Sequence, residues 1–271
     1  MRLRSDRLKQ HNAYLIPIVL AAVAILSGCG NGGNAANPSP TSEPTEGPIP
    51  TLTADQISVG DLLKRIDTAW PTVTNMREVA WSGSASSTVG TPPADVLAST
   101  EETVLPASRR ITTTMGGAPT DDQISVNGAA YFKGSFVVGA VAPFAGADTW
   151  VQVDPAIVPA DSMVGQRLAY LTRPIAPPYG TVSNDLRARA ATPAGTIEAG
   201  GRTCSVFTFV DTTTNGSKID YALSLDDKNL PCSLVQSAGG FENITIYTFN
   251  DPKIVISVPE GATPVSATPE G

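Results

Sequence analysis

The stretch Ser217-Lys218-Ile219-Asp220-Tyr221-Ala222-Leu223-Ser224-Leu225 decides the fold. Every second residue from Ile219 onward is large and apolar, and the residues between them are polar or small. A period of two predicts a β-strand with one buried face. Turn-forming residues stand on both sides of it, Asn215-Gly216 before and Asp226-Asp227 after. The stretch is therefore one strand of a series joined by short turns.

Three neighbouring segments have the same character, being rich in Val, Ile, Thr, Tyr and Phe and separated by turn residues. This spacing predicts an antiparallel meander. Its four strands are Arg202–Asp211, Ser217–Leu225, Leu230–Gln236 and Glu242–Phe249.

The last of these strands has apolar residues on both of its faces. Ile244 and Ile246 alternate with Tyr247 and Phe249, so the two pairs point to opposite sides of the sheet. A sheet that is apolar on both faces has helices on one side and a further layer on the other. We therefore expect an α+β fold in which a sheet wraps around helices.

A helix is predicted before the sheet. Ser58 and Asp61 fit a capping box, in which both side chains satisfy free backbone donors at the helix start. Pro71 ends the helix. The residues at helical spacing form a single apolar stripe, which consists of Val59, Leu62, Leu63, Ile66 and Trp70.

The middle of the chain is predicted to be mostly strand, with two further helical segments. Asp161 caps a helix in which Val164, Leu168 and Leu171 share a face, and a short helix lies near Ser183–Ala190. The expected strands are Arg77–Val89, Ser99–Leu105, Ser108–Met115, Gln123–Asn127, Ala130–Val138 and Thr149–Val153.

The N-terminus has the pattern of a secretory signal. A basic start is followed by the apolar run Ala13–Ser27, which is shorter than the roughly 20 residues of a comfortable membrane span. Leu26-Ser27-Gly28-Cys29 resembles the lipobox of bacterial lipoproteins, in which the cysteine becomes the lipidated first residue. The resemblance implies lipidation at Cys29 and a place on the extracytoplasmic face of the cell membrane. The alternatives are an ordinary signal peptide and a membrane-spanning anchor.

Composition divides the chain into four parts. Residues 1–28 form the signal peptide, and 29–56 form a disordered tether rich in Gly, Asn, Pro, Ser and Thr that starts at the lipidated cysteine. Residues 57–259 form one domain, long enough to bury a core. Residues 260–271 form a disordered tail.

Charge and missing residue types exclude several function classes. The chain has 18 basic and 25 acidic side chains; residues 1–28 hold four basic residues and one acidic, so the mature chain keeps 14 and 24. Such an acidic surface repels phosphate, so we expect no nucleic-acid partner, and attachment to the cytoplasmic membrane depends on acyl chains. The sole histidine, His11, lies in the signal peptide.

A mature chain without histidine cannot form Ser-His-Asp or Cys-His nucleophiles, or histidine-ligated metal sites. The acidic pairs Glu101-Glu102, Asp121-Asp122 and Asp226-Asp227 are expected to be solvated charges at turns or strand ends. We therefore predict no enzyme activity, no metal and no cofactor.

Several segments together resemble one family, the lipoprotein-carrier fold of the LolA-type carriers and the LppX, LprA, LprF and LprG lipoproteins. The resemblance covers roughly residues 57–259, and its motifs are turns and strands rather than catalytic groups. The segments that carry it are Val126–Lys133, Trp150–Asp154, Gly201–Phe207, Tyr221–Asp227, Leu230-Pro231, Phe249–Pro252 and Ile254–Pro259.

The resemblance implies a strongly curved antiparallel sheet, an incomplete barrel, closed over helices around an apolar cavity. It also implies that a lipid or acylated ligand binds in this cavity, for transport or storage outside the cytoplasmic membrane. The alternative to a cavity is an ordinary filled core, and the alternative function is a non-catalytic sensor that binds another envelope protein. The candidate lining residues are Phe207, Phe209, Ile219, Tyr221, Leu223, Tyr247 and Phe249 from the strands, with Leu168 and Leu171 from a helix.

The two remaining cysteines, Cys204 and Cys232, are expected to form a disulfide in an oxidising location. Their strands are predicted to flank Ser217–Leu225, which puts them two strand spacings apart, about 9.6 Å. A disulfide needs Cα atoms within about 6.8 Å. Both cysteines lie near the same end of the sheet, where strands bend. Two reduced, buried thiols are the alternative.

Overall fold

The computed structural model describes residues 52–84, 89–134, 146, 148–179, 182–213 and 216–265. The predicted signal peptide and the predicted tether up to residue 51, with Cys29, lie outside the described residues. No helix among the described residues is long and apolar enough to cross a membrane.

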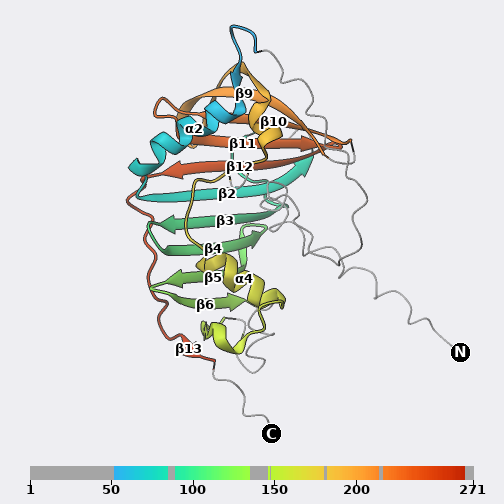
Figure 1. Cartoon of the computed structure of the whole chain (residues 1–271). Coiled ribbons are helices and arrows are strands. Elements are labelled where there is room, and N and C mark those ends of the chain that lie inside the picture. Colours follow the sequence, from blue (N-terminus) through green and yellow to red (C-terminus); the bar gives the residue numbers. More distant parts are fainter. Residues whose placement is uncertain are drawn as a thin grey trace, which may run out of the picture.

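A single curved sheet of 13 strands carries the whole fold and stays open, as Figure 1 shows. Its strand order is β1-β8-β9-β10-β11-β12-β2-β3-β4-β5-β6-β7-β13. All neighbours pair antiparallel except β13, which pairs parallel to β7. The predicted α+β fold with a curved antiparallel sheet over helices is confirmed.

The strands are β1 Ile57–Ser58, β2 Asn75–Ser84, β3 Leu97–Val104, β4 Ser108–Met115, β5 Ala118–Val126, β6 Ala129–Gly134, β7 Val151–Val153, β8 Ala190–Ala199, β9 Arg202–Thr212, β10 Lys218–Leu225, β11 Pro231–Ala238, β12 Phe241–Phe249 and β13 Thr263–Pro264. The helices are α2 Val59–Ala69, α4 Met163–Thr172 and α5 Asn184–Ala188, with short 3-10 turns η1 Trp70–Thr72 and η2 Pro155–Ile157.

Helix α2 forms where the capping box predicts it. The Ser58 hydroxyl accepts a hydrogen bond from the Asp61 backbone N–H and donates one to the Asp61 carboxylate. Its buried residues are the four leading members of the predicted stripe, Val59, Leu62, Leu63 and Ile66. Pro71 lies in the short turn η1, at which the helix ends.

Both main helices lie on one face of the sheet, which we call the helix face (Figure 1). Residues that are directly paired on neighbouring strands point to the same side of the sheet. Tyr247 of β12 pairs with Glu78 of β2, and Glu78 pairs with Glu101 of β3. Glu101 in turn pairs with Ile111 of β4, so all four side chains lie on the same face. Ile111 packs in a cluster with α4, and Tyr247 lines a pocket beside α2. The two helices therefore cover different halves of one face.

The opposite face is also apolar, as the two-faced pattern of Glu242–Phe249 predicts. Ile244 and Ile246 pack there against Trp81. Nearer β6, Ile124 and Tyr131 are covered by the chain that follows β12, including Ile256. The further layer on this face therefore includes the C-terminal segment.

Three expectations need correction. Ser162, not Asp161, caps α4, because its hydroxyl accepts the Gly165 backbone N–H. β8 was not predicted, since Pro193 and Gly195 interrupt it; it pairs with β9 through an irregular register at this point. The tail expected to be disordered from 260 onward is structured at its start, because β13 pairs with β7 and Val265 packs in the α4 cluster.

The predicted disulfide is present, with Cys204 and Cys232 Cα atoms 6.5 Å apart. The intervening strand β10 has its last pair with β9 at Leu225 and Ser205, so Cys204 lies just beyond its end. On the other side the register shifts between Ser224 and Leu225, which leaves Cys232 as the extra residue of a bulge. Strands β9 and β11 therefore approach each other beyond the end of β10. The distance between the two cysteines is for this reason shorter than the two strand spacings expected from the sequence.

Candidate functional site

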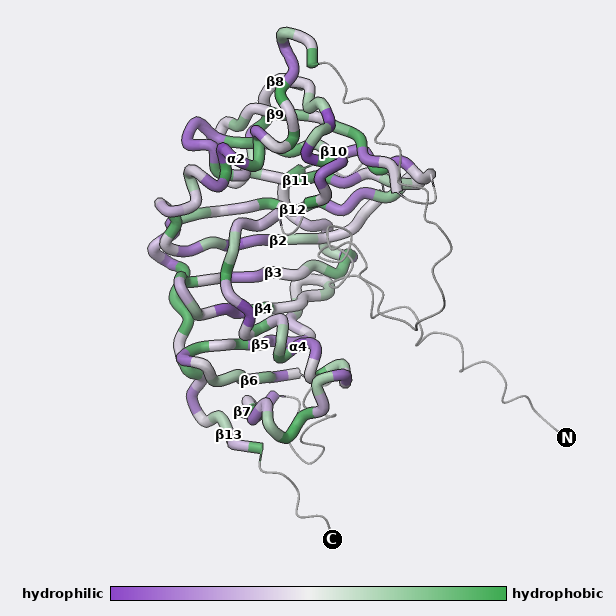
Figure 2. The backbone as a smooth tube through the Cα atoms, viewed as in Figure 1, coloured by the Kyte–Doolittle hydropathy of each residue, from purple (hydrophilic) through white to green (hydrophobic). Residues whose placement is uncertain are grey.

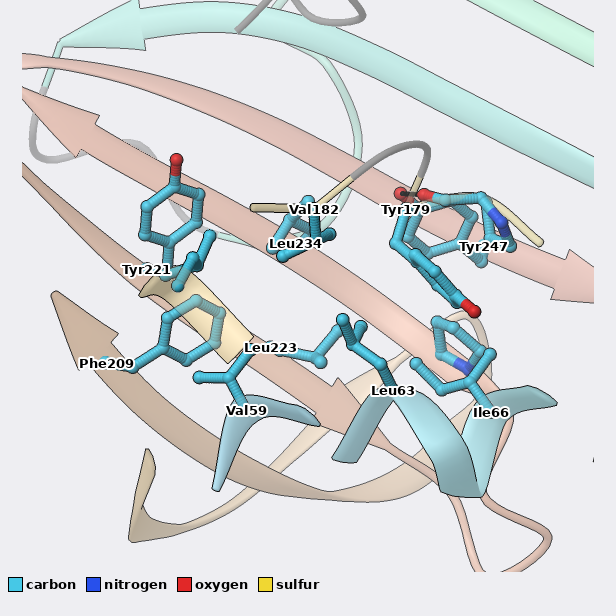
Figure 3. A pocket seen from close by; sticks show the side chains of 13 residues that line it. Val59, Leu63, Ile66, Tyr179, Val182, Phe209, Tyr221, Leu223, Leu234 and Tyr247 are labelled. Atoms are coloured by element: carbon cyan, nitrogen blue, oxygen red, sulfur yellow. Dashed lines mark hydrogen bonds between the residues drawn. The ribbon is translucent and has the colours of Figure 1, made fainter. Parts of the chain in front are cut away.

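A pocket with an almost wholly apolar lining lies between α2 and the helix face of the sheet (Figure 3). Its walls come from α2, from α5, from β9 to β12, and from the segment that joins α4 to α5. The lining residues are Val59, Leu63, Ile66, Pro178, Tyr179, Val182, Leu186, Phe209, Tyr221, Leu223, Pro231, Leu234 and Tyr247.

The strands hold their aromatic side chains in the pocket by alternation. Phe209 and Tyr221 are directly paired across β9 and β10, and their rings stack with centroids 5.0 Å apart. Leu223, two residues along β10, points to the same side. Burial, and then the nearby Asp211, raises the pKa of Tyr221 to about 12, so its hydroxyl stays neutral.

The pocket is narrow in this conformation. It leaves about 40 Å³ for the centres of water-sized molecules, enough for a few waters. A hydrocarbon chain needs the walls to separate. A second depression of about 630 Å³ lies over β8 to β11, but it is open and lined by groups such as Arg189, Thr208 and Asp220, which do not suit an acyl chain.

The described residues of the segment between α4 and α5 are bonded to α2 and to β12 by two tyrosine hydroxyls. The Tyr179 hydroxyl donates a hydrogen bond to Asp67 on α2, and the Tyr247 hydroxyl donates one of 3.4 Å to the Pro178 carbonyl. Both rings stand at one end of the pocket in Figure 3. Burial, then the Asp67 hydrogen bond, raises the pKa of Tyr179 to about 12.

The structure gathers some of the sequence-predicted lining residues and separates others. Phe209, Tyr221, Leu223 and Tyr247 line the pocket. Ile219 is buried in the surrounding cluster, and Phe207 packs against that cluster from β9. These six residues belong to the α2 half of the sheet.

Phe249 and the two helix leucines lie elsewhere. Phe249 stacks against Tyr247 and meets Trp70 edge-on, outside the pocket lining. Leu168 and Leu171 pack with Ile111 and Phe132 in the α4 cluster. The stripe on α4 therefore faces the same side of the sheet but a different half.

Between the two apolar halves the helix face carries charged residues, which we call the polar belt: Glu78, Glu101, Arg109, Tyr170 and Arg173. Figure 2 shows the hydrophilic stretches of β2 and β3 to which the two glutamates belong. Glu78 is the direct cross-strand neighbour of both Tyr247 and Glu101. The belt therefore borders the pocket at Tyr247.

Part of the polar belt is internally satisfied. Glu101 is 2.9 Å from Arg109 Nε and accepts a 2.7 Å hydrogen bond from the Tyr170 hydroxyl. Arg109, only 3 % exposed, also donates to the carbonyls of Tyr170 and Leu171 at the end of α4. Burial, then repulsion by Glu101, raises the pKa of Glu78 to about 8, against the opposing charges of Arg173 and Arg109.

The sequence did not predict this belt. Glu101 was expected to be a solvated charge at a strand end, but it lies within β3 and is bonded. Asp122 was expected at a turn, but it is buried in β5 and pairs with Arg110 at 2.6 Å. Asp226 does lie in the turn after β10, where it pairs with Arg202. One pattern in the sequence could have predicted these ion pairs. Each acidic residue lies inside a strand, and the neighbouring strand β4 carries an arginine that can pair with it.

Comparisons with known proteins give likeness of structure only. No protein-family model matches the sequence, and no curated protein matches it. Among solved structures, the lipoprotein LppX of Mycobacterium tuberculosis matches over 71 % of this chain and 95 % of its own, with 8 % identity and a TM-score of 0.38.

Two further structures are similar at the same level. A LolA superfamily protein from Nitrosomonas europaea matches over 72 % of this chain and 94 % of its own, with 8 % identity and a TM-score of 0.27. MucB, in the Pseudomonas aeruginosa MucA/MucB complex, matches over 72 % of this chain and 58 % of its own, with 16 % identity and a TM-score of 0.33. What this chain binds has to be inferred from its own residues.

Proposed function

We propose that this chain is a lipid-anchored protein of the bacterial cell envelope that binds an acyl chain in the pocket beside α2. The observation that carries the proposal is the lining of that pocket, in which aromatic and aliphatic side chains from a helix and four strands enclose an almost purely apolar space. Moving hydrocarbon from water into such a space is favourable by roughly 25 cal/mol per Å² of buried apolar surface. No reactive group is needed.

The sequence supports the location. The lipobox-like Leu26–Cys29 would attach acyl chains to Cys29, and a mature chain with excess acidic residues needs such an anchor to stay on an anionic membrane. The tether that follows is long enough to hold the domain above the membrane surface, where lipid is within reach.

Binding requires the pocket to widen. We expect the Tyr179 end of the pocket to be where this widening occurs, because the exposed hydrogen bond from Tyr179 to Asp67 contributes little to stability. A ligand that binds only the widened form would shift the population toward it.

Uptake of palmitic acid, measured by equilibrium dialysis of the full chain after delipidation in a bile-salt detergent, tests the proposal. Leu63→Trp fills the pocket from α2 and should abolish uptake, whereas Val210→Trp, on an exposed position of β9, should leave it unchanged. Failure of the unaltered chain to take up any acyl ligand would contradict the proposal.

A second candidate function is binding of another envelope protein without any lipid. The small space in the pocket favours it, since a nearly filled core serves only to hold the sheet. If the unaltered chain takes up no lipid and Leu63→Trp merely destabilises it, this function is preferred.

A further inference from the structure

Two charged side chains of the polar belt have no bonded partner, and they stand next to the pocket. Glu78 forms no hydrogen bond or ion pair with the described residues, although its neighbour Glu101 forms both. Arg173, the residue after α4, forms no ion pair with the described residues either; its guanidinium lies 4.0 Å from the centre of the Tyr170 ring. Arg173 is exposed, so the belt opens to solvent on this side.

Glu78 lies deep in the belt. Its side chain keeps some exposed surface, and the charged and polar groups that act on it are Glu101 from β3, Arg109 from β4, Tyr170 and Arg173 from α4 and its end, and Tyr247 from β12. A carboxyl group in this position holds its proton near neutral pH and is then a hydrogen-bond donor.

Tyr247 connects the belt with the pocket. Its ring lines the pocket, and Glu78 is its direct cross-strand partner on the same face, at about 4.5–5.5 Å between Cβ atoms. A ligand that fills the pocket and extends past this ring would meet Glu78 and then Arg173.

The charge of the belt decides which polar group fits. With Glu78 protonated, Arg109 and Arg173 face a single ionised carboxylate, Glu101, so one positive charge is left over. An anion neutralises it, whereas a cation is repelled. A guanidinium and a carboxyl O–H can donate to the two oxygens of a carboxylate, and a carboxylate carries the one negative charge that balances the belt.

We propose that Glu78 and Arg173 bind the carboxylate of a fatty acid whose hydrocarbon chain lies in the pocket beside α2. This inference rests on the proposed function, since it names the ligand of the same pocket. The other members of the belt position these two residues: Glu101 and Arg109 hold the end of α4, and Tyr170 holds the Arg173 guanidinium by its ring.

The test compares two ligands with the same hydrocarbon chain. The full chain in a bile-salt detergent is dialysed against radiolabelled palmitic acid or hexadecanol at neutral pH. We expect about tenfold tighter binding of the acid, the value of one charge-assisted hydrogen bond. Arg173→Gln should remove this preference but leave hexadecanol binding unchanged. Arg65→Gln, on the exposed side of α2, is the matched control and should keep it.

The pH dependence separates the role of Glu78 from that of a general positive charge. At about pH 9.5, above the pKa of Glu78, the unaltered chain should lose most of its preference for palmitic acid because Glu78 becomes an anion. Glu78→Gln cannot ionise and keeps an N–H donor, so its preference should be the same at both pH values.

Each other outcome has one meaning. Equal binding of the two ligands overturns the carboxylate site but leaves the proposed function standing. Binding of neither ligand contradicts the proposed function itself. Tighter binding of hexadecyl phosphate than of palmitic acid overturns the carboxylate in favour of a phosphate headgroup. Circular dichroism of each variant shows that loss of binding is not loss of fold.

Discussion

Beside α4 the described residues of the helix face form one buried cluster, whereas beside α2 a buried cluster also borders a gap. In the α4 half, Phe132, Val151 and Leu171 are almost completely buried in one cluster. Helix α4 is also held to the loop before it, since a Cβ at Gly165 would lie 2.2 Å from the Pro159 carbonyl oxygen. In the α2 half, the stacked rings of Phe209 and Tyr221 hold the walls apart.

The same arrangement, a helix on a curved sheet, is therefore packed in two ways: around a buried cluster beneath α4 and around a pocket beside α2. In the α4 half the small residue Ala130 is completely buried in the cluster beneath the helix. Large, flat rings in the α2 half cannot interdigitate as fully with the helix. This difference fits the proposal that a ligand binds in the α2 half.

The sharpest way to break this comparison is one substitution made in both halves. Leu171→Ala removes a filled position and should lower the free energy of unfolding by about 4 kcal/mol, whereas Leu63→Ala, beside the existing gap, should cost about 2–3 kcal/mol. Urea unfolding followed by circular dichroism measures both values. A larger cost at Leu63 would show that the α2 half is as tightly packed as the other.

The disulfide belongs to the α2 half only, where it joins β9 to β11 around the end of β10. The double variant Cys204→Ser and Cys232→Ser should lose about 3.6 kcal/mol, the value expected for a closed loop of this length. Urea unfolding with and without reductant provides the control, since reductant should destabilise the unaltered chain but not the variant. Unchanged stability would mean that the packing of β10 alone fixes this end.

The smallest effect concerns the border between the halves. The pKa of Glu78 is raised by folding to about 8, so the folded state holds this proton more tightly than the unfolded state does. The stabilisation of the folded state by the protonated Glu78 carboxyl is therefore complete below about pH 4.5 and is lost as the pH rises through about 8. At about pH 9, Glu78→Gln should be more stable than the unaltered chain by about 1–2 kcal/mol, less than the full shift implies because the carboxyl is partly solvated.

Thermal unfolding between about pH 5 and pH 9 gives this comparison, with Glu260→Gln in the exposed tail as the control. If the melting temperatures of Glu78→Gln and of the unaltered chain change in parallel with pH, Glu78 ionises as freely in the folded protein as in the unfolded one.

The sequence was enough to predict the elements whose pattern is local. The capping box at Ser58 and the alternation from Ile219 to Leu225 each depend on residues close in the chain, and both appear as expected. β8 escaped prediction because it is mostly exposed and contains Pro193 and Gly195, so neither alternation nor propensity marks it as a strand.

What could not be predicted depends on long-range register. An apolar stripe on α4 shows that Leu168 and Leu171 are buried, but not which half of the sheet buries them. Likewise Glu78 and Glu101 are ordinary strand residues in the sequence. Only the pairing of β2 with β3 and β12 brings them together with Tyr247.

The pairing of β2 with β12 has a consequence for the order of folding. Strands β2 to β6 follow one another along the chain, so hairpins on that side can form as soon as they are synthesised. Helix α2 comes before all of them, yet its partners are α5, β9 and β10, near the C-terminus. Helix α2, the first helix among the described residues, therefore keeps its apolar stripe exposed until α5, β9 and β10 are available to pack against it. A chaperone that covers residues 59–66 during this interval would protect the nascent chain from aggregation.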